Sequence, residues 1–529
     1  MPPAPSNIQP SVAPVQPERK QATPVAAAGK HSYGQILKSS VLIGGSSVVK
    51  IGISIVRGKA MAVFLGPSGV GLMGVYGSIV DLTKSIAEMG INSSGVRQIA
   101  EAVGSGDKER IARTTTVLRR ISLLLGATGA AILVLFSRQV SGFTFGSDQH
   151  TVAIALLSLA VFFSLVSDGQ GALVQGMRRI GDLAKMGVLG TLFGTALSVT
   201  LVYFLREKGI IPSLIGVAAM GILISWWFSR KVQIQNPSLT MSEFGHEAVA
   251  LLKLGFAFMA TGFLTMGAAY AVRIIVLRKV DFEAAGLYQA AYNLGGLYVG
   301  FILQAMGSDF YPRLTAIANN NTECNRLVNE QAEISLLLAG PGVIATLTFA
   351  PLVIALFYTT EFAAAVEPLR WICLGMALRV VAWPMGFIVL AKGVQTIIFW
   401  VEIAAAIVHV GLAWLWVTYF GLPGASAAFF GLYVWHGFLM YVIVRRLSGF
   451  RWSAVNRRIG LQFFALIGAV FGSFHLLPFW LATTVGTVAA LGSGVYSARI
   501  LVRLVPMDRM PRLLRQLLVW LRIAHSGID

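Results

Sequence analysis

Residues 46–97 read SSVVKIGISIVRGKAMAVFLGPSGVGLMGVYGSIVDLTKSIAEMGINSSGVR. This stretch is long enough to cross a membrane twice, because a helix needs about 20 residues to span the hydrocarbon core. A glycine-rich turn, residues 65–71, separates the two crossings. Charged residues interrupt both apolar helices: Lys50, Arg57, Lys59, Asp81, Lys84 and Glu88. A charge inside a bilayer is costly unless it faces a partner or water, so this pattern indicates a hydrated path through the membrane.

The composition places the chain among membrane proteins. It is 56% hydrophobic and 12% charged, with a mean hydropathy of +0.72, far above that of a soluble domain. The net charge of +19 does not indicate a nucleic-acid partner, because most positive residues lie in short loops beside hydrophobic spans. The two cysteines, Cys324 and Cys373, fall in a predicted inside loop and a predicted span, so no disulfide is expected.

Apolar runs of helical length follow one another along most of the chain, and they predict an all-α polytopic membrane protein with about 14 spans. The predicted spans are 36–64, 72–98, 116–136, 151–176, 183–205, 209–229, 249–277, 284–310, 331–358, 362–390, 394–420, 423–444, 460–481 and 483–504.

Lysine and arginine in the loops predict the orientation of these spans. With the N-terminus inside, the inside segments hold about 29 positive residues and the outside loops about five. Because cytoplasmic loops carry the excess of positive charge, we expect both termini in the cytoplasm.

A weak internal repeat divides the chain. Residues 71–73 and Tyr76 align with residues 286–288 and Tyr292, after one gap, and each set opens the second helix of its half. Six predicted spans precede the inside loop at 230–248 and six follow it. Since both halves begin inside, the repeat is parallel, about an axis along the membrane normal.

The expected domains follow from this division. Residues 1–35 read as a disordered cytoplasmic tail, 36–248 as an N-terminal six-helix lobe and 249–446 as a C-terminal six-helix lobe. Residues 447–529 hold two additional transmembrane helices and a basic tail. In that tail the pattern at 511–523 predicts an amphipathic helix on the inner membrane surface.

Several motifs resemble those of bacterial O-antigen and enterobacterial-common-antigen flippases, which belong to the multidrug/oligosaccharidyl-lipid/polysaccharide exporter superfamily. The resemblance spans roughly Tyr33 to Arg446 and is most specific in the first two helices. The N-terminal tail and the last two spans depart from the twelve-helix members. The motifs are KIG (50–52), GKAMAV (58–63), FLGPSGVGL (64–72), GIN (90–92), GV (95–96), Tyr270 with Arg273, GLYQ (286–289), VLAKG (389–393) and GASAA (424–428).

The resemblance implies a V-shaped pair of six-helix lobes around a central cavity, in the bacterial inner membrane. Such a protein moves undecaprenyl-pyrophosphate-linked oligosaccharide from the cytoplasmic to the periplasmic leaflet by alternating access. The expected partners are this lipid-linked oligosaccharide and membrane lipids, with polysaccharide-assembly proteins as candidates; no cofactor is expected. The charges agree with this expectation, because a pyrophosphate head needs a cationic, hydrated cavity.

The candidate substrate-binding residues are Lys50, Arg57, Lys59, Tyr270, Arg273, Gln289, Asn293 and Arg379. Arg273 is the strongest of them, because it has no acidic neighbour in its own span. In the register of the repeat it falls beside Arg57 and Lys59.

Two of these residues also allow a structural role. Lys59 points about 160–200° away from the face shared by Lys50 and Arg57, so it can instead snorkel toward the outer interface. Arg379 lies at a depth similar to that of Glu402, which makes a structural ion pair an equal alternative.

The polar, aromatic strip Tyr288, Gln289, Tyr292 and Asn293 can contact sugar, but it can also be an interfacial aromatic belt.

The candidate coupling-ion groups are Asp81 and Glu88, which lie within a span, and the weaker Asp168. Asp81, Lys84 and Glu88 follow i, i+3, i+7 spacing, so they can also neutralise one another on one helix face. No nucleotide-binding motif is present, so an ion gradient, the membrane potential or removal of product must supply the drive.

Two rival functions come from other classes. A membrane glycosyltransferase or O-antigen polymerase usually needs a sizeable outer loop with catalytic residues. Here the largest outer loop, 137–150, holds one acid, Asp148, and no enzyme motif occurs. A drug/cation antiporter of the same superfamily is the closer rival, but it favours acidic cavities, whereas this interior is net basic.

Overall fold

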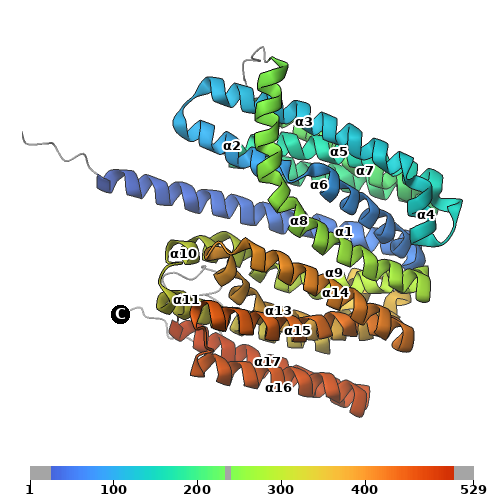
Figure 1. Ribbon diagram of the computed structural model, residues 1–529. Helices are drawn as coiled ribbons and strands as arrows, with labels where there is room; N and C mark the ends of the chain where they lie inside the picture. Colours follow the sequence, from blue (N-terminus) through green and yellow to red (C-terminus); the bar gives the residue numbers. More distant parts are fainter. Residues whose placement is uncertain (1–24, 233–239, 505–529) are drawn as a thin grey trace, which may run out of the picture.

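The computed structural model describes residues 25–232 and 240–504, and within these residues every regular element is a helix (Figure 1). The long helices are α1 Val25–Glu88, α2 Ile91–Ser105, α3 Lys108–Leu135, α5 Thr151–Gly176, α6 Ile180–Leu205, α7 Ile210–Ser229, α8 Met241–Lys279, α9 Phe282–Ala305, α11 Asn321–Thr348, α13 Val366–Ala391, α14 Gln395–Phe420, α15 Leu422–Ser448, α16 Ala454–Leu476 and α17 Phe479–Leu504. Shorter helices are α4 Ser137–Phe145, η1 Asp148–His150, η2 Arg206–Gly209, η3 Met306–Phe310, α10 Tyr311–Ala316, α12 Ala350–Phe357 and η4 Thr360–Ala365.

Nine helical segments in the described part of the chain are long and apolar enough to cross a membrane. One of them, Ile180–Ser229, holds both α6 and α7. Helices α1, α8 and α9, which carry most of the candidate site residues, are not among the nine. The chain is therefore a multi-pass membrane protein, while the exact number of crossings stays a prediction.

Helix α1 contains the predicted glycine-rich turn as a sharp break. Gly66 has φ 64° and ψ −175°, a combination that essentially only glycine adopts, and Pro67 follows it. A Cβ at Gly66 would also lie 3.2 Å from Glu361 Oε2. The break separates the two predicted crossings as expected.

The predicted second span, 72–98, is wrong at its C-terminal end. Helix α1 ends at Glu88, and both Met89 (φ 46°) and Gly90 (φ 66°) are left-handed before α2 begins. A Cβ at Gly90 would lie 2.0 Å from the carbonyl oxygen of Gly255, so the close approach of α8 requires glycine there.

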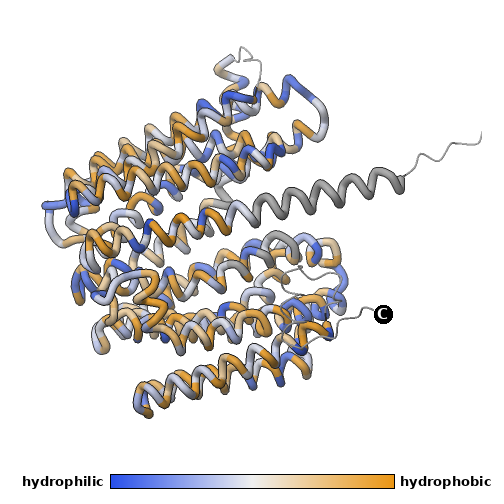
Figure 2. Tube along the Cα trace, turned by 180° about the vertical axis from the view of Figure 1, so that it is seen from behind, coloured by the Kyte–Doolittle hydropathy of each residue, from blue (hydrophilic) through white to orange (hydrophobic). Residues whose placement is uncertain are grey.

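Figure 1 shows α2 to α7 on one side of α1, α9 to α17 on the other, and α8 crossing between them. Each side has its own buried cluster, with Leu157 and Val161 in the first and Ile344 and Val380 in the second. Viewed from behind, hydrophobic residues line the helices of both groups, and hydrophilic residues gather near their ends (Figure 2). We call these the first and the second helix group.

Helix α8 packs into both groups. Tyr270 and Ile274 belong to the core of the first group, whereas Val272 and Val276 belong to that of the second. A step of two residues turns a helix by about 200°, so the two pairs lie on opposite faces. The side chain of Arg273 therefore starts from the boundary between the groups.

A capping box fixes the start of α8. The Thr240 hydroxyl accepts a hydrogen bond from the backbone N–H of Glu243, and the Glu243 carboxylate accepts one from the backbone of Thr240. The hydrogen bonds that the Glu243 carboxylate accepts from the backbone N–H and the hydroxyl of Thr240 lower its pKa. Arg113 Nη1 lies 3.8 Å from Glu243 Oε1, which joins α8 to α3.

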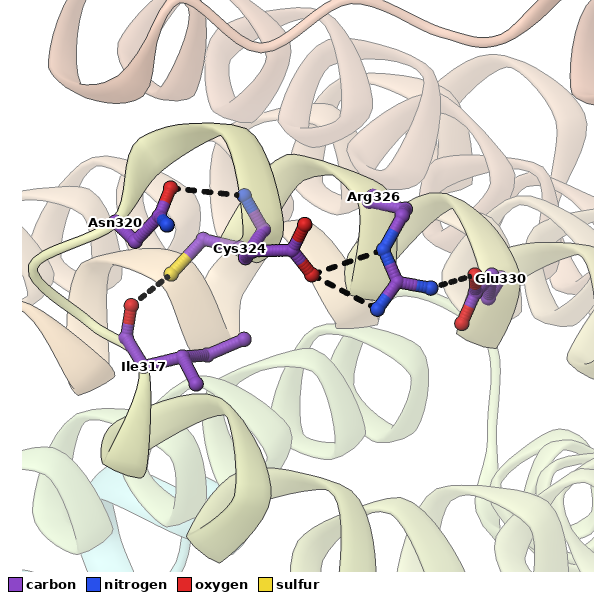
Figure 3. A network of polar contacts seen from close by, with 6 residues as sticks. Ile317, Asn320, Cys324, Arg326 and Glu330 are labelled. Atoms are coloured by element: carbon purple, nitrogen blue, oxygen red, sulfur yellow. Dashed lines mark hydrogen bonds and ion pairs between the residues drawn. The ribbon is translucent and has the colours of Figure 1, made fainter.

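A polar network surrounds the start of α11 (Figure 3). Asn320 caps the helix by accepting a hydrogen bond from a backbone N–H in its first turn, and Arg326 pairs with Glu330 one turn on. Cys324 donates to the carbonyl of Ile317 across 3.1 Å. This cysteine, predicted to lie in an inside loop before the span at 331–358, is in the first turn of α11. Both cysteines are buried and free.

Asparagines tie the end of α15 and the start of α16 to α11. Asn325 Nδ2 donates to the carbonyl of Ser448 across 2.8 Å, and Asn329 Oδ1 accepts from the backbone N–H of Ser453 across 2.8 Å. Asn456 Nδ2 donates to the carbonyl of Asn329, also across 2.8 Å. Satisfied polar networks of this kind rigidify the elements they join, so the start of α16 is fixed to α11. Helix α17 packs against both α11 and α16.

The predicted outer loops are short helices. Residues 137–150 form α4 and η1, held by an ion pair of 2.9 Å between Arg138 and Asp148, and η2 lies within residues 206–210. The predicted disordered tail, 1–35, is helical from Val25 onward, and its earlier part lies outside the described residues. The predicted amphipathic helix at 511–523 also lies outside them.

Candidate functional site

Arg273 joins three helices at the boundary between the groups. Its Nε donates to Gln289 Oε1 on α9 across 2.7 Å, and its Nη1 donates to Ser78 Oγ on α1 across 2.8 Å. Gln289 Nε2 in turn donates to Asn293 Oδ1 across 2.8 Å. The exposed Asp81 lies within electrostatic reach of Arg273. The structure thus brings together three of the predicted substrate-binding residues and one predicted coupling residue.

Arg273 also lines a pocket of about 260 Å³ between α8, α9, α13, α14 and α15. Its walls are mainly apolar and aromatic, and Arg379 and Glu402 add charge. Tyr288 and Tyr292 line the pocket, and Tyr288 is 4% exposed, so the alternative of an interfacial aromatic belt is wrong for Tyr288. Pockets that enclose drug-sized ligands run from about 300 to 1,000 Å³, so this one is too small for a glycan.

Three buried nitrogen atoms in this pocket have no hydrogen-bond partner: Arg379 Nε, His409 Nε2 and His436 Nδ1. The guanidinium of Arg379 stacks over the Trp383 ring at 4.8 Å. Among the described residues, no ion pair within 4.0 Å joins Arg379 to Glu402, although both line the pocket. An unpaired buried nitrogen is costly, so three in one pocket indicate a place for a polar group or water.

Reasoning from sequence missed Ser78, His409 and His436, and it treated Glu402 only as an ion-pair partner. Glu402 and His409 are seven residues apart in an apolar helix, a spacing that puts them on one face and that could have marked the pocket. Ser78 gave no signal, because a serine in a helix commonly bonds its own backbone, as Ser78 also does to Gly74.

Lys59 does not line the pocket. Its Nζ donates to the carbonyl of Ala355 across 2.7 Å and also to that of Tyr358. These carbonyls belong to the last turn of α12 and the residue after it, where helical carbonyls lack partners and a cation is favourable. Lys59 thereby links α1 to the second group, and the Asn293 side chain interacts with the Tyr358 hydroxyl.

The two glycines that the repeat alignment pairs contact each other. A Cβ at Gly71 would lie 2.1 Å from the carbonyl oxygen of Phe282, and a Cβ at Gly286 would lie 1.9 Å from that of Pro67. The backbones of α1 and α9 therefore meet without side chains between them. Together with Lys59 this contact closes the ends of the two groups that we predict to lie outside.

Three predicted substrate-binding residues lie elsewhere. Lys50 packs against Gly187 on α6, and Tyr270 shares a hydrogen bond with Thr144 on α4. Arg57 does not line the pocket either, and its Nε is buried without a partner. The expected equivalence of Arg57 and Arg273 is therefore not seen in their surroundings.

The predicted coupling residues take different partners. Lys84 forms an ion pair of 2.6 Å with Asp168 on α5. It also lies within electrostatic reach of Asp81 and Glu88, so the neutralisation on α1 includes an acid from a second helix. Glu88 accepts a hydrogen bond from the backbone of Asn92. Within residues 25–232 and 240–504, no cluster of His, Cys, Asp or Glu is suited to hold a metal ion.

Comparison with known proteins gives relatives of similar length and fold. The chain is 22% identical over 412 residues to the lipid III flippase of Escherichia coli (strain K12), covering 75% of this chain and 95% of that protein. A multidrug resistance MATE family transporter of the MOP superfamily, in an inward-facing conformation, aligns with a TM-score of 0.67 at 15% identity, covering 78% of this chain and 99% of that one. The lipid II flippase MurJ, in an inward closed conformation, also aligns at 0.67, with 14% identity and coverage of 88% and 100%.

The two structural neighbours share the fold of this chain over the parts that they cover. The polysaccharide biosynthesis protein family matches residues 60–367, which is more than half of the sequence. The chain belongs to the family of polysaccharide biosynthesis proteins.

Proposed function

We propose that the protein is a flippase that moves lipid-linked oligosaccharide across the inner membrane, and not an enzyme. The observation that carries the proposal is the similarity to the lipid III flippase over 95% of that protein's length. Loss of the gene should remove the surface glycan of the organism and leave its lipid-linked precursor in the cytoplasmic leaflet. Loss of the glycan without any precursor would instead indicate an earlier, enzymatic step.

The chemistry of the boundary between the groups supports an undecaprenyl-pyrophosphate carrier as substrate. A pyrophosphate leaving water must regain strong hydrogen bonds, and arginine supplies them in pairs. Arg273 donates to two neutral side chains, Gln289 and Ser78, and a phosphate oxygen is a stronger acceptor than either. The head group would therefore replace these partners, while the glycan stays in the space between the groups.

Alternating access would then follow from the same hydrogen bonds. The chain of contacts runs from Ser78 through Arg273, Gln289 and Asn293 to Tyr358, whose carbonyl accepts from Lys59. A head group that takes Arg273 from Ser78 removes one link between α1 and α8. The outer ends, closed by Lys59 and the glycine contact, would open as that link is lost.

The lobes in this proposal are residues 36–248 and 249–446, each with six crossings. Residues 447–529 add two more, for about 14 crossings in all. The asparagine network around Asn329, which holds α16, and the packing of α17 on α11 support motion of the last two helices with the second group. The net basic charge of the first two crossings favours an anionic substrate over the drug cations of an antiporter.

The orientation is tested by single cysteines in the short outer helices. Gln149→Cys and Lys208→Cys, both at exposed positions, should react with a membrane-impermeant maleimide in intact cells. The native cysteines are 1% and 2% exposed and should give little background. Arg446→Cys, at an exposed inner position, is the control and should react only after lysis. The opposite pattern would reverse the predicted topology.

The coupling group is tested by neutral substitutions. Asp81 is exposed and lies near Arg273, whereas Asp168 is engaged by Lys84, so Asp81 is the better candidate. Asp81→Asn should leave the protein folded and make transport independent of the ion gradient. Asp168→Asn should lower the melting temperature, because Lys84 loses its ion pair of 2.6 Å, and adding Lys84→Met should restore it. If transport by the Asp81→Asn variant still depends on the ion gradient, Asp81 is not the coupling group.

A further inference from the structure

A second cavity lies in the first helix group, apart from the site around Arg273. It has a volume of about 440 Å³ and opens among α3, α5 and α7, at the end of the group that the loop charges predict to be cytoplasmic. Two arginines line it, the half-buried Arg119 of α3 and the exposed Arg230, which follows the last residue of α7. Neither the proposed glycan transport nor the proposed ion coupling uses this cavity.

The positive charge of this cavity is not neutralised by the protein. No acidic side chain lines it, and among the described residues neither Arg119 nor Arg230 takes part in an ion pair within 4.0 Å. Glu88 and Asp168 line a small adjoining cavity that shares Ser122 and Gly169 with this one, and Asp168 is paired there with Lys84. Two guanidinium groups beside one cavity match an anion with several acceptor oxygens, such as a phosphate.

A buried serine lies in the wall of the same cavity. Ser122 is 5% exposed, lines the cavity, and its Oγ has no hydrogen-bond partner. It faces Gly169, since a Cβ there would lie 2.1 Å from Ser122 Oγ. A buried hydroxyl without a partner loses free energy unless a ligand or water supplies one. Ser122 is therefore available to a polar group that enters between the arginines.

The surroundings of the cavity are those of a membrane interface. Trp226, which also lines it, is 52% exposed, and its neighbour Trp227 is 42% exposed, as in the aromatic belts found at headgroup level. Arg230 lies over the Trp226 ring at 4.8 Å. Leu123 and Leu223, beside the predicted headgroup level, are 48% and 54% exposed. In a membrane, lipid acyl chains would cover them. A free anion from water would gain nothing from these apolar side chains.

We propose that this cavity binds the headgroup of an anionic glycerophospholipid of the cytoplasmic leaflet. The phosphate would lie between Arg119 and Arg230, a headgroup or ester oxygen would accept from Ser122, and the acyl chains would follow Leu123 and Leu223. A zwitterionic lipid fits less well, because no carboxylate lines the cavity to receive its cation. Basic pockets between helices at the cytoplasmic interface commonly bind anionic headgroups.

The test compares two double variants of the full chain with equal charge loss. Arg119→Gln/Arg230→Gln removes the two cavity arginines. Arg120→Gln/Lys231→Gln removes the adjacent exposed charges, which do not line the cavity. Each purified protein is titrated in neutral detergent with dioctanoyl phosphatidylglycerol, dioctanoyl phosphatidylcholine or inorganic phosphate, and the melting temperature is followed.

We expect phosphatidylglycerol alone to stabilise the wild type. Arg119→Gln/Arg230→Gln should weaken its apparent affinity by about tenfold or more, since two charge-assisted hydrogen bonds are lost. The control variant Arg120→Gln/Lys231→Gln should change the apparent affinity for phosphatidylglycerol by no more than about twofold, as expected of exposed charges. If the double variant does not elute as a folded protein, the single variants serve, each with an expected loss of about threefold.

The proposal would be overturned if the two double variants lost the same apparent affinity for phosphatidylglycerol. The attraction would then come from the surface charge as a whole. Stabilisation by inorganic phosphate to the same extent would also overturn it, since the cavity would then bind a free anion. Stabilisation by phosphatidylcholine at the same concentration would show that the charge of the lipid is not recognised.

Discussion

Arg273→Ala is expected to abolish glycan export while the protein stays folded in the membrane. Truncating a residue that holds a partly buried charge-assisted contact costs about 2–5 kcal/mol, which lowers the rate at least about 30-fold. Arg273→Lys should restore little, because a lysine cannot reach two acceptors with a planar fork. Gln289→Ala and Ser78→Ala should give smaller losses, since each only holds the guanidinium in place.

The effect is measured as the amount of surface glycan in a strain that lacks the native gene and expresses the variant. This amount is divided by the amount of variant protein inserted in the membrane. Lys253→Ala is the matched control, because Lys253 is an exposed cation of the same helix that does not line the pocket. Normal export by Arg273→Ala at equal expression would remove Arg273 from the site.

Gly286→Ala should shift the protein away from the conformation described here. A Cβ at this position would lie 1.9 Å from the carbonyl oxygen of Pro67, so α1 and α9 must separate to admit it. Overpacking of this kind costs about 1–3 kcal/mol, which lowers the closed population about 5- to 150-fold relative to an open one. Export should fall, because a transporter that cannot close cannot complete its cycle.

Spin labels at Lys208→Cys and Tyr419→Cys report the separation of the two groups at their outer ends. Both positions are exposed. Gly286→Ala should add a population at longer distance, whereas Gly300→Ala should not. Gly300 lies on the same helix with no atom within 4 Å of its added Cβ, so there alanine only gains helix propensity. Identical distance distributions for the two variants would show that the glycine contact does not hold the outer ends together.

Local features of the sequence predicted much of the fold. Apolar runs gave the helices, because each long run must bury or face lipid along its whole length. The glycine-rich turn was correct, since Gly66 and Pro67 impose their backbone geometry wherever they occur. Arg273 was chosen because no acid in its own span explains it, and the structure gives it uncharged partners.

Partners from distant helices could not be predicted in the same way. Periodicity tells which face of a helix a side chain occupies, but not which helix packs there. Lys84 was therefore matched with its helix neighbours and not with Asp168, which is 84 residues further along the chain. Lys59 likewise binds the end of α12, about 300 residues away, through carbonyls that carry no sequence signal.

Translocation by the purified protein is the most direct test of the proposed function. Proteoliposomes are loaded with undecaprenyl-pyrophosphate-linked oligosaccharide, and the glycan that reaches the far leaflet is cleaved by a membrane-impermeant glycosidase. Wild-type protein should expose lipid-linked glycan faster than empty liposomes, and Arg273→Ala should match the empty liposomes. The proposed function is contradicted if folded wild-type protein exposes no more glycan than empty liposomes do, while it exchanges drug cations for protons or sodium across the same membrane.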